Sequence, residues 1–149
     1  DLLDEALYDP NGPLAWMASR VVLEITERAS LDGVDGIQAR IARLRGLGYR
    51  IAIDDIGAGY SGLNSFVALR PDFVKLDMSL GRGIDRDVLK QGLVRMFVEL
   101  CGGLGIGVVA EGVETAAERD ALDALGCDLF QGYLFARPGA AFPKPRFEG

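Results

Sequence analysis

The chain has 149 residues, of which 49% are apolar and 26% charged, and this composition is typical of one globular domain. Its net charge of −6 argues against a nucleic-acid polymer as a partner, because such a partner is held by a basic surface. The absence of histidine excludes a Ser-His-Asp triad and the usual zinc ligand, so any chemistry must use Asp, Glu, Lys or metal-bound water.

Five short apolar runs alternate with stretches of helical spacing. The runs are rich in β-branched residues and predict strands at 20–25, 50–53, 73–76, 106–110 and 128–135. Apolar residues three and four apart predict helices at 34–47, 61–69, 85–104 and 115–125. Strands that are apolar on both faces and alternate with helices indicate a parallel sheet covered by helices.

Three of the predicted helices end at a leucine-glycine pair, at 47–48, 104–105 and 125–126, where glycine can adopt the left-handed conformation that ends a helix. The apolar runs are far shorter than the roughly 18 residues of a membrane span, and no signal-peptide pattern opens the chain. We therefore expect a cytoplasmic protein without membrane contact from this segment. Cys101 and Cys127 show no C-x-x-C spacing and are expected to be buried thiols.

Polar side chains gather where the predicted strands end. They are Glu24 and Glu27, Asp54 and Asp55, Lys75 and Asp77, Glu111 and Glu114, and Gln131 within the last strand. Because parallel strands deliver their carboxyl ends to one edge, the pattern predicts a TIM-type (β/α) barrel, of which the last five strand-helix units are visible. An N-cap is the alternative for any single acid, and Glu114 before Thr115 is one such case.

The adjacent pair Asp54 and Asp55 favours a metal site, since neighbouring carboxylates repel one another unless a cation or a proton lies between them. An all-oxygen ligand set indicates a hard cation such as Mg²⁺ or Mn²⁺. The following segment, Gly57–Gly62, satisfies the dinucleotide-binding pattern G-x-G-x-x-G. We interpret that match as false, because the two carboxylates would face the pyrophosphate.

Several segments occur together in a characteristic order: Leu23–Glu27, Ile53–Ser61, Val74–Asp77, Ala110–Thr115, and Gln131–Phe135 with Arg137-Pro138. In these segments the chain resembles the EAL-domain family of bacterial cyclic di-GMP phosphodiesterases. The resemblance covers residues 1–138, as the C-terminal part of the domain, and leaves 139–149 as a tail. It implies metal-dependent hydrolysis of cyclic di-GMP to linear pGpG in bacterial signal transduction.

The resemblance also implies roles in a centre with two Mg²⁺ or Mn²⁺ ions. Glu24 would bind the first ion, Asp54 would bridge both, and Asp55 would bind the second. Glu111 would lie at the second ion and help to position or deprotonate the water. Lys75 would contact the attacking water and the scissile phosphate.

A second group of residues would support the substrate or the loop after the second strand. Glu27 would brace the loop at 54–61 and Gln131 would line the site, with Asp77 and Glu114 in the same supporting group. The resemblance further implies a homodimer and possible fusion to upstream sensory or cyclase domains.

The chain departs from the family pattern in three ways. The signature triplet does not end a strand, because Glu5-Ala6-Leu7 lies in a helical stretch and is interpreted as coincidence. The signature glutamate and a following asparagine, both ligands of the first ion, would belong to strands before Asp1. Ile56 and Ala58 replace the usual phenylalanine and threonine.

A complete barrel needs about 250 residues and eight strands, so activity would require the upstream part, supplied by a longer protein or by another chain. Two functional classes stay open: a hydrolase, and a non-catalytic EAL-like domain that binds cyclic di-GMP or a partner protein. An unrelated metal-dependent barrel lyase is a third, supported by fold analogy alone.

Overall fold

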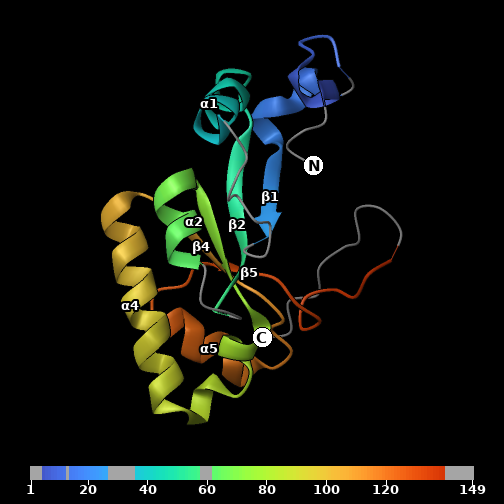
Figure 1. The fold of residues 1–149 in the computed structure, drawn as a ribbon. Helices are drawn as coiled ribbons and strands as arrows, with labels where there is room; N and C mark the ends of the chain where they lie inside the picture. The colour runs from blue at the N-terminus through green and yellow to red at the C-terminus, as the bar shows by residue number, and fades with distance from the viewer. Residues whose placement is uncertain (1–4, 13, 27–35, 58–61, 140–149) are drawn as a thin grey trace.

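The fold is organised around one parallel sheet (Figure 1). The computed structural model describes residues 5–12, 14–26, 36–57 and 62–139, with side chains omitted at 62–65. Five strands lie in chain order, each parallel to its neighbour. They are β1 (Val22–Thr26), β2 (Arg50–Ile56), β3 (Phe73–Leu76), β4 (Gly107–Ala110) and β5 (Leu129–Phe130).

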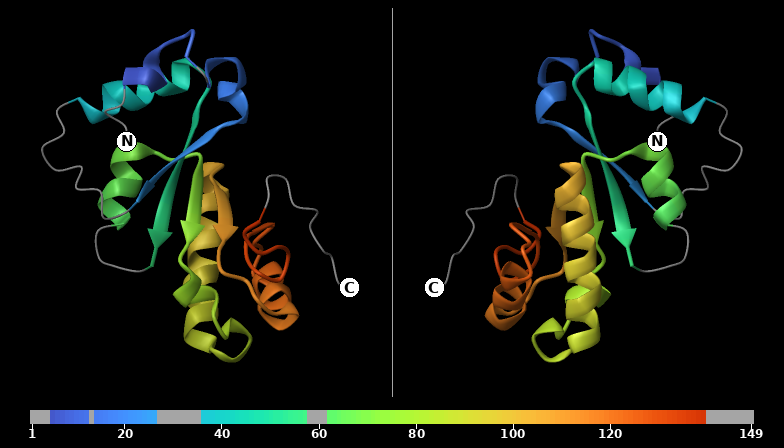
Figure 2. Two further views of the ribbon diagram at one scale, coloured as in Figure 1. Left: turned by 90° about the vertical axis from the view of Figure 1, so that its right-hand side faces the viewer. Right: turned by 90° about the vertical axis from the view of Figure 1, so that its left-hand side faces the viewer.

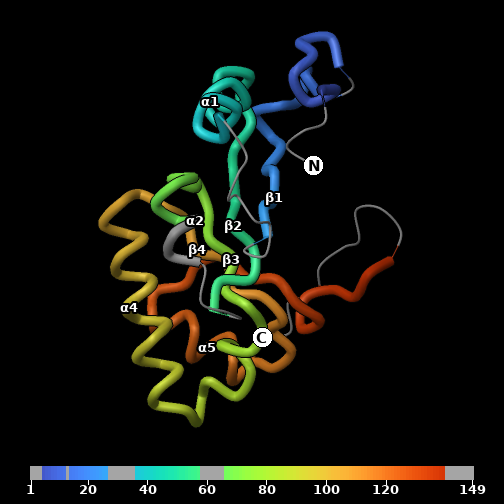
Figure 3. Tube along the Cα trace, viewed as in Figure 1, coloured from blue at the N-terminus to red at the C-terminus, as the bar shows by residue number. Residues whose placement is uncertain are grey.

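Helices make the crossovers that parallel strands require. These helices are α1 (Ile37–Gly46), α2 (Gly62–Leu69), α3 (Met78–Gly81), the 3-10 helix η3 (Ile84–Arg86), α4 (Val88–Leu104) and α5 (Ala116–Ala124). Two more 3-10 helices, η1 (Glu5–Tyr8) and η2 (Ala15–Arg20), precede β1. The trace in Figure 3 follows the chain from strand to helix and back to the sheet.

The strand order distinguishes a barrel from a doubly wound sheet. A dinucleotide-binding sheet reverses its strand order at a switch point, whereas here the order runs from β1 to β5 without reversal. The two side views in Figure 2 show α4 behind the strands from one side and in front of them from the other. Crossovers that stay on one face in sequential order are those of a (β/α) barrel.

The core lies between the strands and these helices. Its fully buried side chains come from β2, β3, α4 and α5 and include Ile51, Ile53, Val74, Leu76, Val94, Cys101 and Leu122. In each strand alternate residues face the helices, so the residues between them project to the other face. This alternation decides where the polar strand residues lie.

Most predicted elements are present, with different boundaries. The glycines after three helices, Gly48, Gly105 and Gly126, all have positive φ, as predicted. The predicted helix at 85–104 is interrupted, because the Asp87 side chain accepts the N–H groups of Leu89 and Lys90 and so begins α4 at Val88.

The predicted strand at 128–135 was too long. Only Leu129 and Phe130 pair with β4, and the chain turns at Gly132. The carbonyl oxygen of Gly132 accepts the N–H groups of Phe135 and Ala136, which closes the turn. A Cβ at Gly132 would overlap the backbone of Val113, so the two backbones are in direct contact there.

Two further predictions concern burial and membrane contact. Cys101 and Cys127 are free and buried, as predicted, and burial raises the pKa of the Cys127 thiol to about 11. Among the described residues, no helix combines the length and the apolar character needed to cross a bilayer. Of the predicted tail at 139–149, only Gly139 lies within the described residues.

Candidate metal-dependent active site

Lys75 is the centre of a charge cluster on the sheet face opposite the helices. Its Nζ lies 3.0 Å from Glu24 Oε1, 3.1 Å from Asp54 Oδ1 and 2.8 Å from Glu111 Oε1. The three carboxylates come from β1, from β2 and from the end of β4, so the cluster joins four strands. The structure therefore brings together side chains that are far apart in the sequence.

Strand alternation explains this convergence. In β3, Val74 and Leu76 pack into the core, so Lys75 projects to the other face. Ile53 and Ile25 pack into the same core, which leaves Asp54 and Glu24 on the face of Lys75. Parallel pairing places Ile25 beside Ile53 and Ile53 beside Val74, and this keeps the polar residues at one level of the sheet.

The Lys75 side chain is only 8% exposed, yet it ends in an ammonium group. Burial alone lowers the pKa of a lysine, but hydrogen bonds to Glu111, Glu24 and Asp54 outweigh burial and raise the pKa of Lys75. Burial also raises the pKa of Glu111, and the ammonium of Lys75 opposes that shift only in part. The cluster thus contains three carboxylates around one ammonium group, that of Lys75.

A β-bulge directs Asp55 into the same region. The β2–β3 register passes from Ile53 opposite Val74 to Ile56 opposite Leu76, so Asp54 and Asp55 together face one residue of β3. Asp55 has φ 62°, and its N–H donates to Asp54 Oδ1 at 3.0 Å. A non-glycine residue in this conformation costs about 1–2 kcal/mol, and such strain is concentrated at functional sites.

The bulge produces an arrangement that fits a divalent cation. Asp54, Asp55 and Glu111 each offer a carboxylate oxygen, and these oxygens lie within 4.8 Å of one another. All three side chains are partly buried, and all donors are oxygens, which suits Mg²⁺ or Mn²⁺. Glu24 and Asp54 meet at Lys75, so the carboxylates extend on both sides of Asp54.

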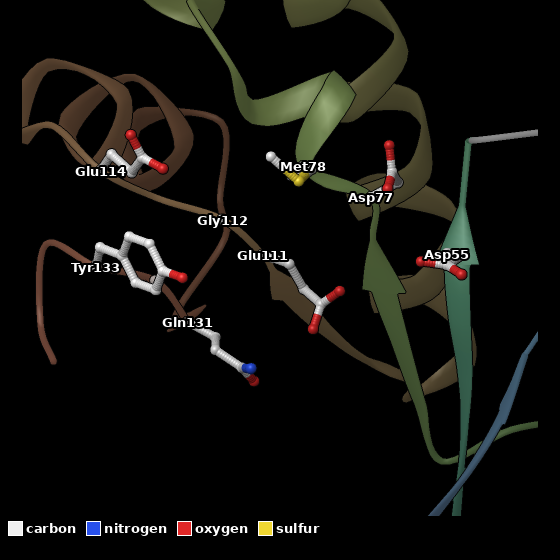
Figure 4. Close-up of a pocket in the computed structure, with 9 residues that line it drawn as sticks. Asp55, Asp77, Met78, Glu111, Gly112, Glu114, Gln131 and Tyr133 are labelled. Carbon is white, nitrogen blue, oxygen red and sulfur yellow. The ribbon is translucent and has the colours of Figure 1, made fainter. Parts of the chain in front are cut away.

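A cavity of about 320 Å³ adjoins the acidic cluster (Figure 4). Asp55 and Glu111 belong to both the cluster and the cavity wall. In the close-up, Glu111 lies between Asp55 on one side and Gln131 and Tyr133 on the other. The guanidinium of Arg137 lies 4.7 Å from the centre of the Tyr133 ring. The cavity is therefore acidic toward the strand ends and aromatic at one side.

Two of the predicted supporting residues also have structural contacts. Asp77 caps α3, since its carboxylate accepts the Ser79 N–H at 2.9 Å. Glu114 does not cap α5; it pairs with Arg82 at 2.7 Å, and a hydrogen bond from Arg82 lowers the pKa of Glu114. Both acids line the cavity, as does Gln131, whereas Glu27 lies outside the described residues.

Four residues near the cavity were not singled out in the sequence. Met78 and Tyr133 line the cavity, Arg82 binds Glu114, and Glu118 is a buried carboxylate. The pattern Thr115-x-x-Glu118 is a capping box and could have identified Glu118. Arg82 carries no comparable local signal, because its partners Gly112 and Glu114 lie 30 or more residues further along the chain.

Comparison with known proteins gives consistent matches. The EAL-domain profile matches residues 3–138. The chain is 38% identical over 120 residues to the cyclic di-GMP phosphodiesterase RocR of Pseudomonas aeruginosa, covering 80% of this chain and 31% of RocR. It thus spans less than a third of the length of that relative.

Two solved structures are similar over most of the chain. The standalone EAL protein from Vibrio cholerae O395, in its c-di-GMP-bound form, has TM-score 0.80 and 38% identity, covering 87% of this chain and 55% of that one. The manganese/cy-diGMP complex of Klebsiella pneumoniae BlrP1 has TM-score 0.76 and 44% identity, covering 81% and 31%. The sheet is therefore the five-stranded part of a TIM-type barrel, and the chain belongs to the EAL-domain family.

Proposed function

We propose that this chain supplies the C-terminal part of a phosphodiesterase domain that hydrolyses cyclic di-GMP to pGpG. The observation that carries the proposal is the contact of Lys75 with carboxylates from three other strand ends, beside a bulge that adds Asp55. The phosphodiesterase RocR and the metal-containing cyclic di-GMP complex of BlrP1 support it.

Each residue of the cluster would have a separate role in hydrolysis. Asp54, Asp55 and Glu111, with Glu24, would hold two Mg²⁺ or Mn²⁺ ions. Bound divalent ions polarise a phosphate and lower the pKa of water. Glu111 lies at the cavity wall and can orient the attacking water, while Lys75, which contacts Glu111, would offer its positive charge to the phosphodiester. Gln131 can donate its amide to substrate or water in the cavity.

The decisive experiment measures turnover by the complete protein, because the rest of the barrel is needed to enclose the site. After treatment with a chelator, cyclic di-GMP should be stable, and added Mg²⁺ or Mn²⁺ should restore its conversion to pGpG. Micromolar binding without turnover would instead identify a cyclic di-GMP receptor. A complete protein that neither binds nor hydrolyses cyclic di-GMP would contradict the proposal.

We also propose that the protein forms a homodimer through α4. The outward side of this helix carries large apolar side chains spaced three or four residues apart, namely Leu89, Leu93, Met96, Leu100 and Leu104, all exposed. Opposite it, Val94 and Cys101 are buried in the core. If two copies pack against one another along this stripe, the leucines and Met96 of one copy meet those of the second.

This apolar stripe predicts the result of a charged substitution. Leu93→Glu and Leu100→Glu should each give monomer, because each places an unpaired charge in the middle of the apolar contact. Sedimentation velocity is the measurement, with Val67→Glu on the exposed side of α2 as the control. A wild-type monomer, or a Leu93→Glu variant that stays dimeric, would exclude this interface.

The remaining proposals concern the context of the chain. We propose a cytoplasmic location, supported by two cysteines that are free and buried. We propose residues 139–149 as a tail to the EAL domain, and we place sensory or cyclase domains among the possible upstream partners. The relative MucR of Pseudomonas aeruginosa, which is named a bifunctional diguanylate cyclase/cyclic di-GMP phosphodiesterase, supports a cyclase domain as one of them.

A further inference from the structure

The turn after β3 is tied to two different helices. On one side, Lys90 of α4 donates from Nζ to the carbonyl oxygens of Ser79 and Arg82, both at 2.7 Å. On the other side, Glu118 of α5 accepts the N–H of Gly83 at 3.0 Å. The segment that contains α3 and η3 is therefore held between α4 and α5, although its own helices have only four and three residues.

Glu118 does more than cap α5. Its Oε2 accepts the N–H groups of Thr115 at 3.2 Å and Glu114 at 3.1 Å, as expected at the third position of a capped helix. Its Oε1 reaches Gly83, 35 residues earlier in the chain, and a capping box does not require that contact. The side chain is 5% exposed, so all three hydrogen bonds are shielded from water.

The charge of Glu118 is maintained by these bonds. Burial alone raises the pKa of a carboxyl group, but the backbone N–H groups of Gly83, Glu114 and Thr115 outweigh burial and lower the pKa of Glu118. An ionised carboxylate accepts at both oxygens, whereas an amide offers one acceptor and one donor group. Only the carboxylate can therefore bind both turns at once.

Arg82 makes a second connection between the same two turns. Its Nη2 lies 2.7 Å from Glu114 Oε1 and donates to the carbonyl oxygen of Gly112 at 3.3 Å, while Nη1 lies 3.7 Å from Glu118 Oε1. Gly112 has φ 65°, and a Cβ there would lie 2.5 Å from Met78 Cβ. The turn after β3 and the turn after β4 are thus in direct contact as well as bridged by charged groups.

These two turns form much of the cavity wall. The first contributes Asp77 and Met78, and the second contributes Glu111, Gly112 and Glu114. We propose that Glu118 and Arg82 are positioning residues, which hold the two turns together and thereby keep Glu111 and the cavity in the geometry needed for metal and substrate. This inference rests on the proposed phosphodiesterase function of the site, and neither residue is assigned contact with the reacting atoms.

Glu118→Gln is the direct test, because it preserves size and removes one acceptor. In the complete protein we expect the dissociation constant for Mn²⁺, measured by electron paramagnetic resonance, and the KM for cyclic di-GMP each to rise about tenfold. Exchange of the Gly83 N–H with solvent should accelerate. Arg82→Gln should produce a similar change, and the double variant should lose less than the product of the two single losses.

Thr115→Ala is the matched control. It removes the other half of the capping box on α5 without touching the bond from Gly83 to Glu118. It should lower the melting temperature about as much as Glu118→Gln but leave Mn²⁺ affinity and KM unchanged. If the two variants behave alike in all these measurements, Glu118 is only a helix cap and the inference is overturned.

The outcomes separate this inference from the proposed function. Wild-type protein that binds neither Mn²⁺ nor cyclic di-GMP would contradict the proposed function. Wild-type protein that binds both, with unchanged binding in Arg82→Gln and Glu118→Gln, would contradict the positioning role alone. Should Glu118→Gln fail to fold, Arg82→Gln decides, because the side chain of Arg82 is 39% exposed and takes no part in capping α5.

Discussion

Lys75→Met should lower the kcat for cyclic di-GMP hydrolysis by about 100- to 1,000-fold at saturating Mn²⁺. Methionine keeps much of the length and apolar character of the lysine stem, so the variant removes the charge without opening a large cavity. The loss follows from the position of the ammonium, which lies within 3.1 Å of Glu24, Asp54 and Glu111. No other Lys or Arg in the described part of the chain forms an ion pair with these three carboxylates.

The same variant should also destabilise the metal-free protein, by about 3 kcal/mol. Without Lys75, three carboxylates remain close together with no cation between them, and two of these side chains are less than one fifth exposed. Added Mn²⁺ should recover part of the lost stability, because it neutralises the same group of charges. Thermal unfolding with and without Mn²⁺ measures both effects.

Arg86→Met is the matched control for this prediction. Arg86 pairs with Asp85 in an exposed position, and its side chain is 89% exposed. The substitution removes one positive charge from the chain without touching the cluster. The kcat should therefore stay within twofold of wild type, and the free energy of unfolding within about 0.5 kcal/mol. A Lys75→Met enzyme with wild-type kcat would rule out the role given to the ammonium.

The face on which the polar strand residues lie was predictable, because side chains in a strand alternate with a period of two residues. Once Ile25, Ile53 and Val74 are recognised as core residues, Glu24, Asp54 and Lys75 must lie on the opposite face. Parallel pairing then places them at a common edge. This part of the site depends only on local pattern and strand order, and both can be read from one sequence.

Asp55 and the positioning residues were harder to predict because they depend on contacts distant in the chain. Simple alternation after Asp54 would send Asp55 toward the helices, and only the bulge against β3 directs it to the acidic cluster. The sequence pattern around Glu118 indicates only a helix cap, and the contact with Gly83 becomes known only from the structure. The length of the last strand was overestimated for a similar reason, since the turn that follows it at Gly132 lies against the backbone of Val113.

Asp55→Asn should separate metal binding from folding most clearly. Asparagine has nearly the same shape as aspartate and tolerates the left-handed conformation, so the observed φ of 62° presents no obstacle. Asp55 forms no ion pair with Lys75 in the structure, in contrast to Asp54. The substitution therefore removes a negative charge from the cluster without breaking an attractive pair.

Two effects of opposite sign are expected from Asp55→Asn. The metal-free variant should be as stable as wild type or up to about 1 kcal/mol more stable, because repulsion with Asp54 and Glu111 is relieved. Its affinity for Mn²⁺ should fall at least about 100-fold, since one carboxylate ligand is lost. At a Mn²⁺ concentration 100 times the wild-type dissociation constant, wild type should gain about 2.7 kcal/mol and the variant less than about 0.5 kcal/mol.

Calorimetric titration with Mn²⁺ and thermal unfolding of the same samples measure these quantities. Asp123→Asn, at an exposed position of α5, is the charge-matched control and should keep both the affinity and the Mn²⁺-dependent stabilisation. A variant that loses stability without metal but retains Mn²⁺ affinity would show that Asp55 serves the fold of the bulge. The opposite pattern, greater stability without metal and weaker binding, is what a strained carboxylate held at a cation site requires, because its repulsion is relieved only when the cation is present.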